Sequence, residues 1–213
     1  SKTIKAYRID LTQFISHISE VCIEDINQDT LEQYISHLHQ TYQPKTVKRK
    51  IASLKAMFHY FEYKGLIAQN PFCKVQVKFR EPIILPKTIP LDTVECLLKT
   101  VYSQQNNAKT VHQRKNAIRD AAVCELLFAT GMRISELCSL NANDINLHDG
   151  TILIYGKGNK ERRLQLSNSD VLSALGSYKT EFSAEIENCH HFFVNQSGSP
   201  LSDQTVRRMI NKY

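Results

Sequence analysis

The sequence predicts a mainly α-helical protein of two domains, of which only the second contains a small antiparallel β-hairpin or sheet. Apolar residues recur at three- and four-residue steps through most of the 213 residues, which is typical of helices that pack on one face. The period changes once, over residues 151–166, where two β-favouring runs flank a turn that contains two glycines. Between the two halves lie three of the six prolines, Pro82, Pro86 and Pro90.

These prolines mark the predicted domain boundary. Proline fixes φ and lacks a backbone donor, so we expect an extended linker over residues 81–90. Residues 1–80 then form an all-helical domain, and residues 91–213 form the mainly helical second domain. The net charge is +6, and residues 1–80 carry most of it, with 12 Lys and Arg against 7 Asp and Glu. A basic domain favours a polyanion partner, although modest basicity is common among proteins.

Three helices are expected in the first domain. The first runs from Thr3 to His17 and the second from Thr30 to Leu38, each with an apolar stripe. Thr46 can cap a third, because its hydroxyl can accept a hydrogen bond from the first helical turn. A short fourth helix fits residues 63–67, before Asn70-Pro71.

The second domain is expected to be built from helices around one β-hairpin. Its longest helix, over residues 114–129, should be buried and should end at Gly131 in the left-handed conformation. Ser202 can cap a last helix whose inward face includes Val206 and Tyr213. The other expected elements are helices over 92–102, 134–140 and 171–180, strands over 151–155 and 161–166, and a short strand or extended piece over 192–194.

The helix that follows Thr46 is predicted to have one apolar and one basic face. Its apolar stripe runs from Val47 to Phe61, while small Ala52 and Ser53 would let the other face approach a groove. Such a helix can pack on its domain and lie against DNA phosphates, although a solvated lysine-rich surface explains the same pattern. The candidate DNA contacts are Lys45, Thr46, Lys48, Arg49 and Lys55.

Arg133 is the strongest candidate for chemistry. It follows the helix-ending Gly131, and Met132 and Ile134 on either side should anchor in the core and leave the arginine pointing sideways. The planar guanidinium suits two phosphate oxygens, and Glu136, three residues on, can orient it. A purely structural Arg–Glu pair at a helix start is the alternative.

Lys157 lies on the glycine-flanked turn of the predicted hairpin. The glycines let backbone and ammonium approach a ligand closely, and a lysine there can act as a point charge or a proton donor. The alternative is an ordinary exposed turn lysine. A Walker phosphate loop fits poorly, because the G-x-x-x-x-G-K-[ST] spacing is missing and no helix follows.

No metal or other cofactor is expected. The six cysteines form no CxxC pair, and most are predicted to be reduced and buried, as in a cytoplasmic protein. His190-His191 lacks a partner at ligand spacing and is assigned to the surface or to an interface. No apolar run reaches the roughly 20 residues of a membrane span, so no membrane partner is expected.

These motifs together resemble the Xer-like branch of the phage-integrase family, the tyrosine site-specific recombinases. The resemblance is carried first by Thr130-Gly131-Met132-Arg133-Ile134-Ser135-Glu136-Leu137, and then by Asp144-Ile145 and the stretch from Gly156 to Arg162. Residues 3–11, Leu85-Pro86-Lys87 and residues 200–213 add to it, so that it covers essentially the whole chain in the family's order.

The resemblance implies a reaction in which a tyrosine attacks a DNA phosphodiester. The products are a 3′-phosphotyrosyl bond and a free 5′-hydroxyl, without a metal or nucleotide cofactor, and exchange takes place in a tetramer on two duplexes. Arg133 would hold the scissile phosphate, Lys157 would protonate the leaving 5′-oxygen, and Glu136 would support Arg133. The basic helix would lie in the major groove, and the two domains would clamp the double-stranded DNA.

Part of the family pattern is missing from the sequence. The family continues with His-x-x-Arg, a further His or Trp, and the nucleophilic tyrosine, but no His follows His191 and Tyr213 aligns with a structural position. Gln165 also replaces the proline usual after the hairpin, which should be tolerated. We therefore expect the chain to bind DNA and contribute Arg133 and Lys157 without cleaving, as part of a longer enzyme or as a naturally truncated product.

Two other functions remain open at this point. One is a non-catalytic DNA-binding regulator that occupies recombination sites, and the other is a generic basic helical scaffold. A downstream His-x-x-Arg and tyrosine would favour the enzyme, and a stop codon would favour the regulator. A scaffold would show no salt-dependent affinity for DNA.

Overall fold

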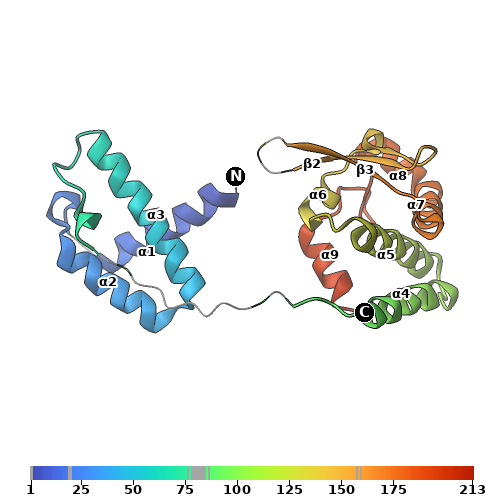
Figure 1. The fold of residues 1–213 in the computed structure, drawn as a ribbon, viewed down its shortest axis with the longest axis horizontal. Coiled ribbons are helices and arrows are strands. Elements are labelled where there is room, and N and C mark those ends of the chain that lie inside the picture. The colour runs from blue at the N-terminus through green and yellow to red at the C-terminus, as the bar shows by residue number, and fades with distance from the viewer. Residues whose placement is uncertain are drawn as a thin grey trace. The chain divides into compact units, whose positions relative to one another are not determined.

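The computed structural model is mainly helical, in agreement with the predicted fold class (Figure 1). It describes residues 2–18, 21–75, 77, 85, 87–156, 158 and 160–213. The chain divides into two compact units, Ser1–Pro86 and Lys87–Tyr213, called here the N-terminal and C-terminal units. Half of the predicted linker, including Pro82 and Pro86, lies outside the described residues, so the limits 1–80, 81–90 and 91–213 stay a prediction.

Three long helices build the N-terminal unit, as predicted. Each buries an apolar stripe in a common core, where the ring of Phe14 meets Tyr34 and Phe58 edge-on at centroid distances of 4.9 and 6.2 Å. Edge-to-face packing of this kind suits aromatic rings in a closed core. The elements are α1 (Lys2–Ile18), the 3-10 turn η1 (Ile23–Asp25), α2 (Gln28–Thr41), α3 (Pro44–Tyr63) and the 3-10 turn η2 (Pro71–Cys73).

Two details of the prediction for this unit are wrong. Helix α3 begins at Pro44 with Gln43 as its N-cap, so Thr46 lies inside the first turn and does not cap the helix. Proline is favoured at the first helical position, because its φ is already helical and its missing N–H would have no partner there. The short helix predicted over 63–67 is absent, since α3 itself continues to Tyr63 and Gly65 then turns the chain with φ of 69°.

The described part of the C-terminal unit packs six helices with one small sheet, and all helices predicted for this unit are present. The predicted last helix is confirmed, with the Ser202 hydroxyl accepting a hydrogen bond from the Thr205 N–H at 3.2 Å. The helices are α4 (Leu91–Asn106), α5 (Val111–Thr130), α6 (Ile134–Cys138), α7 (Ser169–Glu181), α8 (Ser183–Cys189) and α9 (Asp203–Ile210); a 3-10 turn, η3 (Ala142–Asp144), precedes the strands β1 (Ile145–Asn146), β2 (Thr151–Tyr155) and β3 (Glu161–Gln165).

Helix α5 is the centre of this unit. It packs against α4 and α7 and also contacts α6 and α9, so it is buried almost all round over residues 117–126 (Figure 1). It ends as predicted at Gly131, whose φ of 60° is left-handed and whose N–H donates to the Leu127 carbonyl oxygen at 2.9 Å. The most buried helix of the unit therefore fixes the position at which the chain turns toward Arg133.

The sheet has three antiparallel strands in the order β1-β2-β3. Ile152 pairs with Leu164 and Ile154 with Arg162, so the predicted hairpin is confirmed. Strand β1 was not predicted, because two residues are too few to show a period. Helix α8 was also missed; it is seven residues long and buries only Ile186.

One further expectation, about the cysteines, is corrected by the structure. Residues 192–194, expected as a short strand or an extended piece, are buried and form no regular strand, and Val194 makes an isolated bridge with Pro200. The cysteines are free, but Cys22, Cys73 and Cys96 are exposed, because they lie at element ends or on outward helix positions. Within the described part of the chain, no helix is long and apolar enough to cross a bilayer.

Candidate functional site

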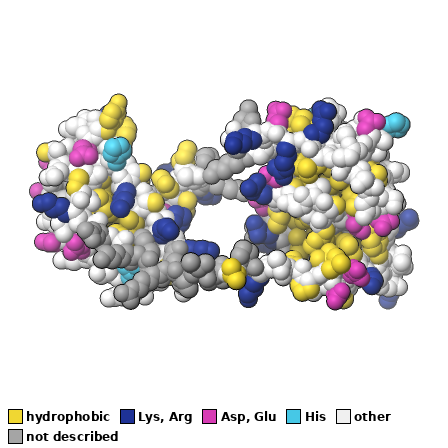
Figure 2. Space-filling model, viewed as in Figure 1, with side chains coloured by type: hydrophobic (Ala, Val, Ile, Leu, Met, Phe, Trp, Pro, Cys, Tyr) yellow, Lys and Arg dark blue, Asp and Glu magenta, His cyan; other side chains and the backbone are white. Residues whose placement is uncertain are grey.

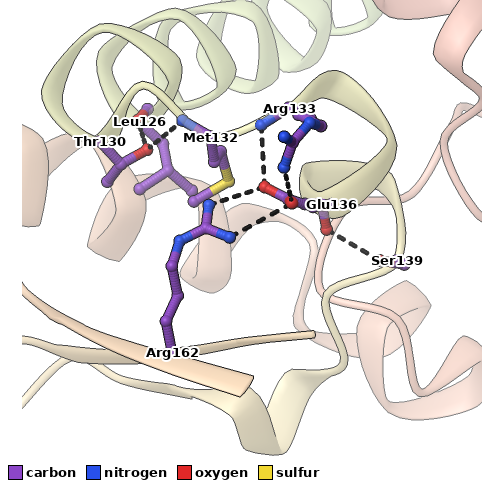
Figure 3. A network of polar contacts seen from close by, with 7 residues as sticks. All are labelled: Leu126, Thr130, Met132, Arg133, Glu136, Ser139 and Arg162. Carbon is purple, nitrogen blue, oxygen red and sulfur yellow. Dashed lines mark hydrogen bonds and ion pairs between the residues drawn. The ribbon is translucent and has the colours of Figure 1, made fainter. Parts of the chain in front are cut away.

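Arg133 is held at the start of α6 by the turn that ends α5. Met132 is buried, and its N–H lies 3.3 Å from the Thr130 hydroxyl, which itself donates to the Leu126 carbonyl oxygen (Figure 3). The turn is therefore anchored on both sides of Gly131, while the side chain of Arg133 is 73% exposed. An anchored backbone with an exposed guanidinium is suited to binding an anion from solution.

Glu136 lies beneath this arginine and contacts it twice, as predicted. Its Oε2 accepts from the backbone N–H of Arg133 at 3.0 Å and its Oε1 accepts from Arg133 Nη1 at 2.8 Å. The first bond caps α6 and the second orients the guanidinium. The carboxylate itself is only 5% exposed, so a buried acid holds an exposed base.

Arg162 is a third member of this cluster and was missed as a site residue. From β3 it donates Nη2 to Glu136 Oε2 at 2.7 Å and Nη1 to Glu136 Oε1 at 3.2 Å (Figure 3). A sequence signal did exist: in the alternating stretch from Glu161 to Gln165, Arg162 shares the inward face with Leu164. A charged residue on an inward strand face calls for an acidic partner.

The two arginines change the acid–base behaviour of Glu136. The hydrogen bond from Arg162 is the main cause that lowers the pKa of Glu136 to about 2, with the bonds from Arg133 adding to it against the opposing effect of burial. Glu136 is therefore ionised throughout the physiological range. The cluster of Arg133, Glu136 and Arg162 carries a net charge of +1.

The predicted role of Lys157 falls outside the described residues, but its neighbour Gly156 lies beside the cluster. A Cβ built on Gly156 would lie 3.6 Å from Glu136 Oε1 and 3.7 Å from Arg162 Nη1. On the other side of Lys157, Gly158 has a φ of 78°, which favours glycine. The turn that carries Lys157 therefore leaves β2 next to the carboxylate that orients Arg133.

The basic face predicted on α3 is present in part. Lys45, Lys48 and Lys55 are exposed, and Thr46 is half-buried. Ser53 does not belong to this face, contrary to the prediction, because it is buried and its hydroxyl donates to the Lys50 carbonyl oxygen.

Arg49 has a buried acidic partner in α1. Its guanidinium pairs with Asp10, which is fully buried, and Asp10 also binds the Lys50 ammonium at 3.1 Å. Lys50 is itself buried, bonds to Gln13 and lies 4.8 Å from the ring centre of Tyr42. Arg49 remains 43% exposed, so one edge of it can still meet a ligand.

Figure 2 shows where basic side chains gather on one face of the molecule. Lysine and arginine side chains cluster on the C-terminal unit around α6 and the adjoining ends of β2 and β3. This is the region that contains Arg133 and Arg162. The local charge therefore favours an anionic ligand.

Three tyrosines of the C-terminal unit are poor candidates for a nucleophile. Tyr213 donates its hydroxyl to Asp120 at 3.0 Å, and burial together with that carboxylate raises its pKa. Tyr102 and Tyr178 also have raised pKa values, chiefly through burial. Among the described residues, no group of three or more His, Cys, Asp and Glu side chains is placed to hold a metal ion.

Known protein families match both units. Residues 95–213 match the phage integrase family, and residues 1–65 match the phage integrase N-terminal SAM-like domain. A tyrosine recombinase of Agathobacter rectalis is 62% identical over 212 residues, which are 100% of this chain and 69% of that protein. Tyrosine recombinase XerD of Listeria monocytogenes is 33% identical over 220 residues, which cover 99% of this chain and 70% of that protein.

Solved structures of similar fold include two recombinases in complex with DNA. The post-cleavage complex of XerH with its palindromic difH substrate has a TM-score of 0.75 at 23% identity, over 98% of this chain and 62% of that one. The lambda integrase tetramer on a Holliday junction has a TM-score of 0.73 at 17% identity, over 100% of this chain and 59% of that one. At these identities the likeness shows the fold, while the sequence matches show that the chain belongs to the phage integrase family of Xer-like tyrosine recombinases.

Proposed function

We propose that these 213 residues bind double-stranded DNA and supply two cations to the active site of a site-specific recombinase. Arg133 binds the scissile phosphate and stabilises the negative charge that grows on it, and Lys157 protonates the leaving 5′-oxygen. Glu136 orients Arg133. The observation that carries this proposal is the 73% exposed guanidinium of Arg133, fixed by a buried carboxylate on an anchored turn.

The covalent step needs an attacking tyrosine, for which Tyr213 is a poor candidate. In the proposed reaction, a tyrosine oxygen attacks phosphorus, the bond to the 5′-oxygen breaks, and that oxygen takes a proton from Lys157. Tyr213 is hydrogen-bonded to Asp120 and has a raised pKa, which opposes its use as the attacking oxygen. The nucleophile and the His-x-x-Arg cluster are therefore assigned to sequence outside these residues.

DNA binding by the N-terminal unit is assigned to the exposed basic side chains of α3. Lys45, Lys48, Arg49 and Lys55 provide the charge, and Thr46 lies among them. Counterion release on binding phosphates makes such affinity strongly dependent on salt. The recombinase acts as a tetramer on two duplexes, as the lambda integrase complex suggests by its assembly on a Holliday junction.

A suicide duplex that carries the protein's own recombination site tests the proposal. The full-length recombinase should form a covalent protein–DNA adduct, whereas residues 1–213 alone should bind the same duplex without forming one. An adduct on residues 1–213 would assign the nucleophile to one of their tyrosines. Absence of salt-dependent binding by residues 1–213 would reject the DNA-binding role itself.

A further inference from the structure

Glu136 accepts hydrogen bonds from two arginines, and the two arginines bind it in different ways. Arg162 uses both terminal nitrogens of its guanidinium, one on each carboxylate oxygen, at 3.2 and 2.7 Å. Arg133 uses one terminal nitrogen, at 2.8 Å, and adds its backbone N–H at 3.0 Å. Four donors therefore satisfy both oxygens of this carboxylate.

The arginine that binds Glu136 through both terminal nitrogens is also the less exposed of the two. Arg162 is 39% exposed and lies flat against the carboxylate, whereas Arg133 is 73% exposed. Among the described residues, Glu136 is the one acidic partner recorded for the Arg133 side chain. Since one negative charge faces two positive charges, the cluster has one positive charge to spare, and the more exposed arginine presents it.

We propose that Arg162 is a positioning residue that neutralises Glu136, so that the guanidinium of Arg133 keeps its charge and its remaining donors available for a DNA phosphate. This inference rests on the proposed function of Arg133. It gives Arg162 a role that acts through Glu136, without contact between Arg162 and the reacting atoms.

Without Arg162, Glu136 should compete with the DNA phosphate for the guanidinium of Arg133. The buried carboxylate would then have Arg133 as its only cation among the described residues, and a bidentate Arg133–Glu136 pair would be the best replacement. Such a pair is neutral and has fewer free donors for a phosphate. Gly156 lies beside Glu136 and Arg162, so the change would also reach the residue that precedes Lys157.

A pair of double variants distinguishes this mechanism from a general loss of charge. Arg162→Gln alone should weaken binding of residues 1–213 to a generic duplex oligonucleotide by about tenfold, the usual effect of losing one charged hydrogen bond. Glu136→Gln in the same chain should restore most of that loss, because glutamine keeps the N3 capping position but does not capture Arg133. Glu161→Gln with Arg162→Gln has the same net charge and should restore little, since Glu161 is the exposed neighbour on β3.

The state of Glu136 gives a readout that needs no DNA. In a carbon-13 NMR titration of the Glu136 carboxyl, Arg162→Gln should raise its pKa from about 2, whereas Arg163→Gln should leave it low. Arg163 is the matched control because it carries the same charge one position along β3 on the exposed face. If Arg162→Gln does not fold, the same pairs built on Arg162→Met, which is also uncharged, replace it.

The outcomes separate the inference from the proposed function. Equal DNA affinity of the two double variants, or a Glu136 pKa that Arg162→Gln leaves unchanged, would overturn the role of Arg162. A wild-type chain without salt-dependent DNA affinity would overturn the proposed function instead, and the NMR titration would still decide whether Arg162 governs Glu136.

Discussion

Asp10 in the N-terminal unit and Glu136 in the C-terminal unit are buried carboxylates whose charge is neutralised by cations of different exposure. Each is a buried carboxylate that pairs with two cations. Asp10 binds Lys50, whose side chain is 3% exposed, and Arg49, which is 43% exposed. Glu136 binds Arg162 and Arg133, which are 39% and 73% exposed.

The difference teaches where binding capacity lies. In the N-terminal unit one of the two cations, Lys50, is buried in the core, and its ion pair with Asp10 joins α3 to α1. In the C-terminal unit both cations reach solvent and Arg133 is mostly exposed, so the cluster has one positive charge available to bind a ligand. A cluster with a buried cation thus mainly stabilises the fold, whereas a cluster with two exposed cations can bind a phosphate.

The largest effect is expected from the most exposed cation. Arg133→Ala in the full-length recombinase should lower the rate of covalent adduct formation on a suicide duplex by roughly 10²–10³-fold, the usual loss when one group that stabilises a transition-state charge is removed. Arg133→Lys is the matched variant; it keeps the charge, loses the planar fork and should fall in between. Adducts at the wild-type rate in Arg133→Ala would reject the role of Arg133.

The most buried cation should matter for stability. Lys50→Met should destabilise the chain by about 3 kcal/mol, because Asp10 would lose its enclosed partner and keep only Arg49. Urea denaturation followed by circular dichroism measures this effect. Lys48→Met, two positions earlier on the exposed face, is the control, and equal losses in the two variants would show that Lys50 is not special.

The exposed cations of α3 should affect DNA affinity more than stability. Arg49→Ala and Lys48→Ala should each weaken duplex binding severalfold and reduce the slope of log affinity against log salt by about 0.9, the value for one phosphate contact. Arg49→Ala leaves Asp10 paired with Lys50, so the fold should persist. A salt slope equal to that of the wild type in both variants would refute this helix as the DNA face.

The smallest effect concerns acid stability. The pKa of Glu136 is about 2 in the folded chain against an ordinary 4.5, so its contribution to stability is fully present above pH 4.5 and is lost as the pH falls toward 2. Arg162→Gln, by raising the folded pKa, should flatten the dependence of stability on pH in this window. Denaturation curves at several pH values check this, and equal slopes for the variant and the wild type would count against the assigned cause.

The parts of the molecule that the sequence predicts well are those that depend on near neighbours. The helices followed from apolar stripes, the end of α5 from Gly131, and the contact between Arg133 and Glu136 from a three-residue spacing. Fold class and family could therefore be predicted from motifs alone.

What could not be predicted depends on which distant residues meet. The pairing of Arg162 with Glu136 spans 26 positions, and that of Lys50 with Asp10 spans 40. No spacing rule links such residues. The start of α3 was misplaced for a local reason, because the preference of Pro44 for the first turn outweighed the capping ability of Thr46.

A neutral phosphate provides the most direct measurement of the central claim, that Arg133 acts on the charge of the scissile group. The rate of adduct formation by the full-length recombinase is compared between wild type and Arg133→Ala, on a normal duplex and on one with a methylphosphonate at the cleavage position. We predict that the roughly 10²–10³-fold defect on the normal duplex shrinks to about tenfold or less on the methylphosphonate, which has no charge for the arginine to stabilise. An equal defect on both duplexes would contradict this role for Arg133.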